Sequence, residues 1–415
     1  MKKSAIALAL SAALVGSAFA TEGPVPKGIA HLDHVFLIMM ENHGYSQILN
    51  NPNAPFINRL AQSANLATNY FAIGHPSLTN YLEVVGGSNF GVQSDNNPDW
   101  HNATCVTNLQ SGVANTDVPA SPSICPIAGV GMDAATPAVD TVNEAPNPGD
   151  IMLNIDGIQS IPAAYTTGKT IADQLAAYGL KWKSYQENLP AAGPDRVNYS
   201  DGFFTNNTDF SSIQPALNPP LTKADIVSLY AAKHNPFVYF RNTQEGDEGN
   251  SLKNSVGFDG DDGLFADLRA GRVPAFSFIA PNQCNDQHGR GNAGPFCNYD
   301  PVSDGSQAGM NPALTIRSDQ TVEKLVGAIK ASRVWKEGHN AIVVLWDEND
   351  YSVKPNNNQV MLIVDTNYGK HAVKSNKRYN HFSVLKTIES GFELPCLNHA
   401  CDQNVSVMSD LFAHH

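Results

Sequence analysis

After its first twenty residues, the 415-residue sequence lacks any uncharged apolar run long enough to cross a membrane. Positive charge is also scarce, because 26 Lys and Arg stand against 39 Asp and Glu, giving a formal net charge of −13. An acidic chain is a poor match for the phosphate backbone of nucleic acids and for anionic lipid surfaces. We therefore expect neither a nucleic-acid partner nor stable membrane anchoring, and the oligomeric state stays open.

Cysteine is sparse, and no pair shows the C-x-x-C spacing that is typical of zinc sites built on thiolates. The even number, six, predicts three disulfides if the chain enters an oxidising compartment. Their connectivity cannot be deduced from the sequence. We expect local pairing: Cys105 with Cys125, Cys284 with Cys297, and Cys396 with Cys401.

The N-terminal segment 1–20, MKKSAIALALSAALVGSAFA, has the three parts of a Sec signal peptide. Lys2 and Lys3 precede a short apolar stretch, and Ala18-Phe19-Ala20 forms a small-residue cleavage pattern. We expect a mature protein of residues 21–415 that is periplasmic or secreted. Its 24 basic and 39 acidic residues give a formal charge of −15.

Four short apolar runs end abruptly in polar clusters, which is typical of buried strands in a parallel sheet. These runs are His34–Met40, Ala67–Ala72, Ala275–Ala280 and Ala341–Trp346. Helical apolar spacing occurs at Ala54–Ala64, Ser77–Val85, Thr170–Tyr178, Ala224–Ala232 and Arg317–Ser332. The alternation predicts an α/β fold, a three-layer α/β/α sandwich around a mostly parallel sheet. Because such strands carry their ligands at their carboxyl ends, the polar clusters should meet in one place.

Segment 88–166 is rich in Gly, Pro, Asn, Asp and Ser, and it shows little periodicity. We expect a loop-rich, ordered insertion over the site, held by Cys105 and Cys125. A flexible surface loop explains the same composition equally well. The segment has one tryptophan and no lysine or arginine, which disfavours a membrane-docking surface.

Two of the polar clusters offer oxygen ligands. Asp347 and Glu348 are adjacent carboxylates after a buried run, and they repel each other unless a cation lies nearby. Glu41 and Asn42 follow another run and add a carboxylate and an amide oxygen. This set suits a divalent metal. The alternatives are two acids that face opposite ways in a surface turn, and a capping acid followed by a turn residue.

Ser77 lies where a predicted strand turns into a predicted helix, a position that favours a bound anion. No G-x-S-x-G elbow or Ser-His-Asp order is present, so a metal would have to activate the hydroxyl. Asn80, one turn later, could donate its amide to a phosphoryl oxygen. Considered alone, the motif favours an ordinary helix N-cap.

Asp286 and His288 form a D-x-H pair, which can bind metal or hold phosphate with the acid orienting the histidine. The alternative is a polar loop fixed by a disulfide at Cys284. His381 begins a predicted helix and His234 precedes a predicted strand. For both histidines a structural role stays open.

Six segments together resemble a known family: MMENHGYS, GHPSLTNYL, KHNPF, PNQCNDQH, VVLWDENDYS and YNHFSVLKTIE. The resemblance, from about His31 to Phe412, is to the bacterial phosphoesterases. That family holds acid phosphatases and non-specific phospholipases C within the alkaline-phosphatase-like superfamily. It implies one phosphoesterase domain with an alkaline-phosphatase-like fold. It also implies a nucleophile, Ser77; metal ligands Glu41, Asn42, Asp347 and Glu348; catalytic histidines His288 and His381; and phosphate-binding residues Asn80, His234 and Asp286.

The resemblance implies an acid phosphatase that hydrolyses small phosphomonoesters through a phosphoserine. Family phospholipases often carry histidine and glycines after the paired acids, whereas here the run is Asn349-Asp350-Tyr351-Ser352. We therefore expect one divalent metal of unknown identity, with two possible, and an acidic pH optimum from partly protonated pocket histidines. A phospholipase C-like phosphodiesterase and a non-catalytic exported protein that binds metal or phosphate stay as alternatives.

Overall fold

The computed structural model describes residues 22–90, 92, 95, 98, 168–189, 229–247, 249–290, 295–302, 304–350, 352–355 and 357–413. The expected signal peptide at 1–20, most of the expected insertion at 88–166, and the Cys105–Cys125 pair lie outside these residues. Both other expected disulfides, Cys284 with Cys297 and Cys396 with Cys401, are confirmed. Within the described ranges, no helix combines the length and apolar character needed to cross a membrane.

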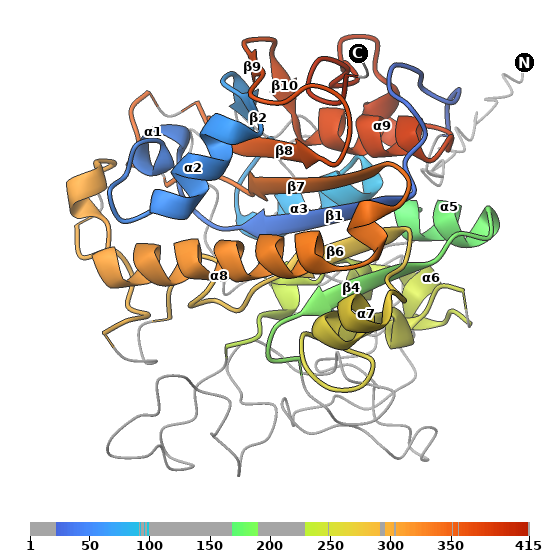
Figure 1. Cartoon of the computed structure of the whole chain (residues 1–415), viewed down its shortest axis with the longest axis horizontal. Coiled ribbons are helices and arrows are strands. Elements are labelled where there is room, and N and C mark those ends of the chain that lie inside the picture. The colour runs from blue at the N-terminus through green and yellow to red at the C-terminus, as the bar shows by residue number, and fades with distance from the viewer. Residues whose placement is uncertain are drawn as a thin grey trace, which may run out of the picture.

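The main sheet has eight strands in the order β5-β4-β6-β1-β7-β8-β2-β9 (Figure 1). Their bounds are β1 His34–Met40, β2 Asn65–Ala67, β4 Trp182–Gln186, β5 Ser255–Gly257, β6 Phe276–Ala280, β7 Asn340–Trp346, β8 Leu362–Thr366 and β9 Lys374–Ser375. All neighbouring strands run parallel except for the two pairs that β8 makes with β7 and β2. The mostly parallel sheet is therefore confirmed.

Strand β1 lies at the centre, with Leu37 in register with Phe278 of β6 and Val343 of β7. Every residue of β6 and β7, and all of β1 except His34, is buried. Burial on both faces explains why these strands are nearly continuous apolar runs.

Helices cover both faces of the sheet. Figure 1 shows α2 (Pro55–Ser63), α7 (Leu264–Ala270) and α8 (Pro312–Ala331) in front and α3 (Ser77–Gly86) behind. On that rear face α3 packs against α5 (Ile171–Ala177) and α9 (His381–Gly391). Two short helices, α1 (Tyr45–Ile48) and α6 (Arg241–Gln244), complete the α-helices of the described chain. The result is the expected three-layer sandwich.

Two predicted strands are wrong. The run Ala67–Ala72 is split, because β2 ends at Ala67 and β3 (Tyr70–Phe71) pairs instead with β10 (Tyr379–Asn380) in a separate two-stranded sheet. His234 ends a 3₁₀ turn (Ala232–His234), and the run after it forms a second 3₁₀ turn (Pro236–Tyr239) in place of the predicted strand. Proline at the first position of the second turn suits a helical start better than a central strand.

Most of the helix predictions are confirmed. Those at Ala54–Ala64, Ser77–Val85 and Thr170–Tyr178 are confirmed within a residue or two as α2, α3 and α5. The helix predicted at Arg317–Ser332 begins earlier, at Pro312, after an Asn311 cap. Of Ala224–Ala232 the structure describes only residues 229–232, and 229–231 are not helical.

Candidate active site

The carboxyl ends of β1, β6 and β7 bring three acidic residues together. Asp347 N donates to Met40 O at 2.9 Å, and Glu41 N donates to Asp286 O at the same distance. These backbone hydrogen bonds hold Glu41, Asp286 and Asp347 side by side, with each side chain at most 1% exposed. The predicted convergence at the strand ends is confirmed for these clusters.

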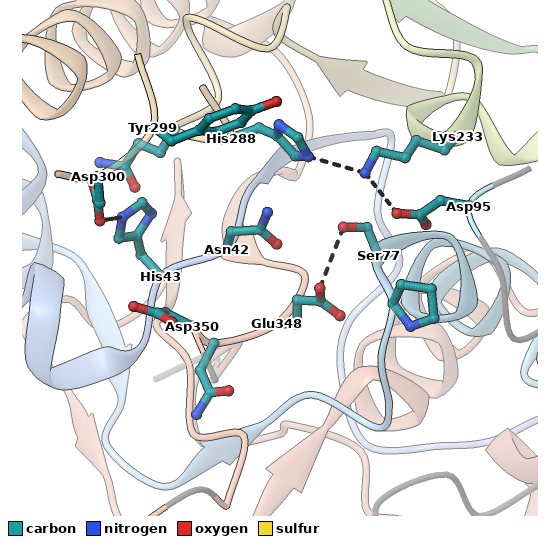
Figure 2. A pocket seen from close by; sticks show the side chains of 13 residues that line it. Asn42, His43, Ser77, Asp95, Lys233, His288, Tyr299, Asp300, Glu348 and Asp350 are labelled. Carbon is teal, nitrogen blue, oxygen red and sulfur yellow. Dashed lines mark hydrogen bonds and ion pairs between the residues drawn. The ribbon is translucent and has the colours of Figure 1, made fainter. Parts of the chain in front are cut away.

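Ser77 joins them from the first position of α3. Its Oγ donates to Glu41 Oε2 at 3.1 Å and lies 3.5 Å from Glu348 Oε1. Ser77 and Glu348 both line a cavity of about 240 Å³ (Figure 2). The backbone N–H groups of the first turn of α3 lie beside this hydroxyl, an arrangement that attracts anions.

Two further groups orient the acids around Ser77. Tyr81, one turn along α3, donates its hydroxyl to Glu41 Oε1 at 2.5 Å. Asn42 adopts a left-handed backbone conformation, with φ of 53°, and its N–H donates to Asp347 Oδ1 at 2.9 Å. Asparagine tolerates this conformation better than most residues.

The acids carry strongly shifted pKa values. Burial, and then the charges of Asp347 and Asp286, raise the pKa of Glu41 well above its ordinary value. Burial raises the pKa of Asp347 to about 6 and that of Asp286 well above its ordinary value. Such crowding is costly unless a cation joins the group.

The oxygen atoms present fit a divalent cation. Asn42 Oδ1 and Asp347 Oδ2 are buried and accept no hydrogen bond from the described residues. Together with Glu41 and Glu348 they form a set of carboxylate and amide oxygens, which hard cations prefer. Glu41, Asn42, Asp347 and Glu348 are thus chemically suited to the role that the sequence predicted for them.

A second group of possible ligands shares Glu41. Atoms of Glu41, His234 and His288 lie within 4.8 Å of one another. However, Lys233 Nζ lies 3.0 Å from His288 Nε2, so a metal on that nitrogen would meet an ammonium group. His234 bridges two acids instead, with Nε2 3.0 Å from Glu41 and Nδ1 3.2 Å from Asp286. We therefore favour the oxygen set.

Positive charge beside Ser77 comes from lysine and not from histidine. Lys233 Nζ donates to His288 Nε2, while His288 Nδ1 donates to Gly289 O at 2.8 Å, so the ring is neutral. Burial, and then Lys233, lower the pKa of His288 to about 3. Burial also lowers the pKa of His234 well below its ordinary value. The expectation of partly protonated pocket histidines is therefore wrong for His234 and His288.

Asn80 lies beside the nucleophile, but its side chain is engaged with protein. Its Oδ1 accepts from the N–H groups of Ile73 and Gly74, both at 3.1 Å. Its Nδ2 donates to Gly74 O at 2.9 Å and to Glu348 Oε2 at 3.1 Å. Asn80 thus holds the turn before Ser77 and orients Glu348, where the sequence predicted a direct phosphate contact.

His381 lies behind the site and does not line the cavity. The ring is completely buried; Nε2 donates to Asp347 O at 2.6 Å and Nδ1 accepts from the Tyr70 hydroxyl at 2.5 Å. Burial lowers its pKa to about 4. This placement gives His381 a positioning role for Asp347 and corrects the expectation that it acts on the substrate.

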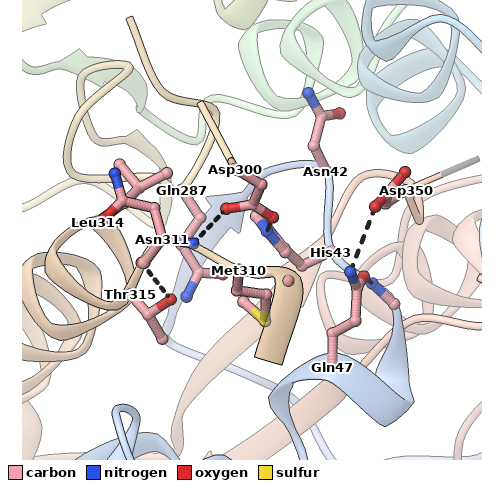
Figure 3. A network of polar contacts seen from close by, with 12 residues as sticks. Asn42, His43, Gln47, Gln287, Asp300, Met310, Asn311, Leu314, Thr315 and Asp350 are labelled. Atoms are coloured by element: carbon pink, nitrogen blue, oxygen red, sulfur yellow. Dashed lines mark hydrogen bonds and ion pairs between the residues drawn. The ribbon is translucent and has the colours of Figure 1, made fainter. Parts of the chain in front are cut away.

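The opposite wall of the cavity is polar. His43 Nε2 lies 3.0 Å from Asp300 Oδ2, and Asp300 Oδ1 accepts from Asn311 N at 2.7 Å (Figure 3). Gln47 Nε2 donates to Asp350 Oδ2 at 3.3 Å. Although burial alone would lower the pKa of His43, the hydrogen bond and charge of Asp300 raise it overall. Histidine and carboxylate side chains therefore face Ser77 across the cavity.

Sequence reasoning missed four residues of the site. His75 Nδ1 lies 2.9 Å from Glu348 Oε2, and Tyr81 and Lys233 make the contacts described above. His75, Tyr81 and Lys233 lie in segments that carried the family resemblance, so the sequence could have indicated them as site residues. Asp95, which pairs with Lys233 at 2.8 Å, falls in the low-periodicity segment and had no such signal.

The chain is similar to a family model and to several named proteins. A model described as the Phosphoesterase family matches residues 47–295. A probable acid phosphatase of Kluyveromyces lactis is 23% identical over 89% of this chain and 61% of its own length. An acid phosphatase of Aspergillus fumigatus is 24% identical over 63% of this chain and 38% of its own length. The chain therefore spans less than two thirds of these two relatives.

A bacterial relative matches over more of its length. A phosphatidylinositol-3-phosphatase of Mycobacterium tuberculosis is 24% identical over 95% of this chain and 88% of its own length. Among solved structures, a protein in the alkaline phosphatase superfamily from Vibrio parahaemolyticus has a TM-score of 0.41 and 14% identity. That match covers 92% of this chain and 72% of the other. The α/β fold class is established by the strand order and the helix layers described above.

Proposed function

Because the chain belongs to the Phosphoesterase family, we propose that it is a metal-dependent phosphoric-ester hydrolase that acts on phosphomonoesters. One observation carries the proposal: the Ser77 hydroxyl, at the start of α3, donates to Glu41 Oε2 at 3.1 Å inside a cluster of buried carboxylates. A protein that only bound metal or phosphate would gain nothing from a hydroxyl there. Export to the periplasm or medium, predicted from residues 1–20, belongs to the same proposal.

The metal ligands in this proposal are Glu41, Asn42, Asp347 and Glu348, with one divalent cation as the preferred number. When bound, the cation would supply positive charge that lowers the pKa of the neighbouring serine hydroxyl. Tyr81 keeps Glu41 oriented and His381 holds the backbone of Asp347.

Ser77 Oγ is the nucleophile in the proposed reaction. It attacks phosphorus, the bond from phosphorus to the substrate alcohol breaks on the opposite side, and solvent water protonates the departing oxygen to give the free alcohol. Glu41 Oε2 already accepts the hydrogen bond of the hydroxyl and can take its proton. Lys233 and the first N–H groups of α3 hold the non-bridging oxygens. Water then hydrolyses the phosphoserine.

Monoesters are favoured as substrates by two observations. The cavity of about 240 Å³ is small, and among the described residues its walls include the polar side chains of His43, Asp300 and Asp350. The relatives are named acid phosphatase and phosphatidylinositol-3-phosphatase, and both names denote phosphatases.

A metal-reconstituted substrate panel tests the proposal. We expect kcat/KM to be higher for a small aryl phosphate than for a phosphocholine diester at every pH in a series. Ser77→Ala serves as the blank for contaminating activity. A clear preference for the diester would move the protein to the phospholipase C-like alternative. Phosphate binding with no turnover of any ester would favour the non-catalytic alternative.

A further inference from the structure

A carboxylate of the protein lies among the groups that would bind a phosphoryl group. Asp95 Oδ1 accepts from the backbone N–H of Leu78 at 3.0 Å, and Asp95 Oδ2 accepts from Lys233 Nζ at 2.8 Å. Leu78 directly follows Ser77. Figure 2 shows Asp95, Lys233 and Ser77 next to one another on one side of the cavity.

These two donors are suited to an anion that is attacked by Ser77. The Leu78 N–H belongs to the first turn of α3, a ten-residue helix, so it has no acceptor within the helix and lies at the positive end of the helix dipole. Lys233 adds a full positive charge. The two Asp95 oxygens occupy these donors as two non-bridging oxygens of a phosphoryl group on Ser77 would.

Few basic side chains of the cavity could bind that anion. Among the described residues that line the cavity, Lys233 is the one lysine or arginine, whereas Glu348, Asp300 and Asp350 are acidic. Its ammonium already contacts Asp95 and His288. A phosphate that contacts Lys233 must therefore share it with the Asp95 carboxylate or displace that carboxylate.

We propose that Asp95 is a built-in competitor for the phosphoryl group, which weakens the binding of the inorganic phosphate product. The inference rests on the proposed function and adds a determinant of affinity to the same site. Its consequence is a higher KM for monoesters and weaker product inhibition than Lys233 and the α3 terminus alone would give. Asp95 is a specificity-determining residue here and takes no part in bond breaking.

Direct binding of inorganic phosphate to the metal-loaded protein, measured by calorimetry, tests the proposal. Asp95→Asn keeps an oxygen for the Leu78 N–H but removes the competing charge. We expect it to tighten the phosphate Kd by about tenfold, with a parallel fall in the KM for an aryl phosphate and no rise in kcat. Glu323→Gln is a matched control, since it removes a carboxylate from an exposed ion pair with Arg59 and should leave the Kd unchanged.

A double variant identifies the route of the effect. If Asp95 competes for Lys233, the tightening of the phosphate Kd by Asp95→Asn should largely disappear when Lys233→Gln is also present. A phosphate Kd that is unchanged or weaker in Asp95→Asn would overturn the proposal and leave Asp95 as a cap of α3. Equal tightening of the phosphate Kd by Asp95→Asn with and without Lys233→Gln would also overturn the proposal.

The binding measurement is independent of turnover. If wild type hydrolyses no ester but Asp95→Asn still tightens phosphate binding, the proposed function fails and the competitor role stands. If wild type is an active phosphatase but Asp95→Asn changes neither Kd nor KM, only the competitor role fails.

Discussion

The hydroxyl of Tyr81 offers a sharp test of the role of Glu41. It donates to Glu41 Oε1 at 2.5 Å, and the tyrosine ring stacks on His234 with centroids 5.2 Å apart. The side chain is fully buried. Tyr81→Phe therefore removes one hydrogen bond to a proposed metal ligand and keeps the ring packing.

Two independent magnitudes agree on the size of the effect. A hydrogen bond to a charged group contributes about 1.5–3 kcal/mol. Loss of a partner that orients a metal ligand typically weakens metal binding by about 10–100-fold, and each tenfold step corresponds to about 1.4 kcal/mol. We expect Tyr81→Phe to raise the metal concentration for half-maximal activity by about 10–100-fold, with activity largely recovered at saturating metal.

Metal titration of the chelator-stripped protein, followed by turnover of an aryl phosphate, measures this shift. Tyr185→Phe is the matched control, because Tyr185 is also buried and donates to a carboxylate, Asp267 Oδ2, at 2.8 Å outside the site. Both variants should lose some stability, but only Tyr81→Phe should change the metal dependence. An unchanged metal dependence in Tyr81→Phe, or an equal shift in both variants, would refute the reasoning.

Three further predictions concern the metal, a buried acid and the disulfides. Chelation should abolish turnover and added divalent metal should restore it, whereas full activity in a verified metal-free sample would contradict this. Burial raises the pKa of Glu389 well above 4.5, so the folded state binds the proton more tightly and the free energy of unfolding should fall as pH rises from 4.5 toward the raised value. Denaturant unfolding across that pH range should show no such fall in Glu389→Gln. An equal dependence of the free energy of unfolding on pH in both proteins would contradict this role of Glu389. Peptide mapping without reduction should find all six cysteines oxidised, including Cys105 with Cys125, and free thiols would contradict the assigned compartment.

The strand ends of the site could be predicted because the central strands are buried on both faces. Strands β1, β6 and β7 are apolar runs that end where the side chains must become polar, and the parallel arrangement puts those ends at one edge. Local patterns therefore sufficed to bring Glu41, Asp286 and Asp347 together.

The roles of Asn80 and His381 could not be read from local patterns. His381 reaches Tyr70 because β3 pairs with β10, a contact between segments about three hundred residues apart that no periodicity reveals. Asn80 is engaged because the turn at Ile73 and Gly74 folds back onto α3. Family resemblance assigned Asn80 to phosphate binding and His381 to catalysis, whereas in the fold the polar atoms of both side chains contact protein groups.

The contact between Lys233 and Asp95 could not be predicted from the sequence for a similar reason. They are 138 residues apart and meet only in the folded cavity. Burial, and then the charge of Lys233, lower the pKa of His288, where the sequence predicted partial protonation.

The central claim, that Ser77 is the nucleophile, is tested most directly by trapping the covalent intermediate. The metal-loaded protein is mixed with an aryl phosphate, quenched in acid and digested, and the phosphorylated peptide is mapped. We predict a phosphoryl group on Ser77, and in Ser77→Ala no such peptide and a loss of turnover by several powers of ten. A phosphoryl group on a histidine, or undiminished turnover in Ser77→Ala, would contradict the account.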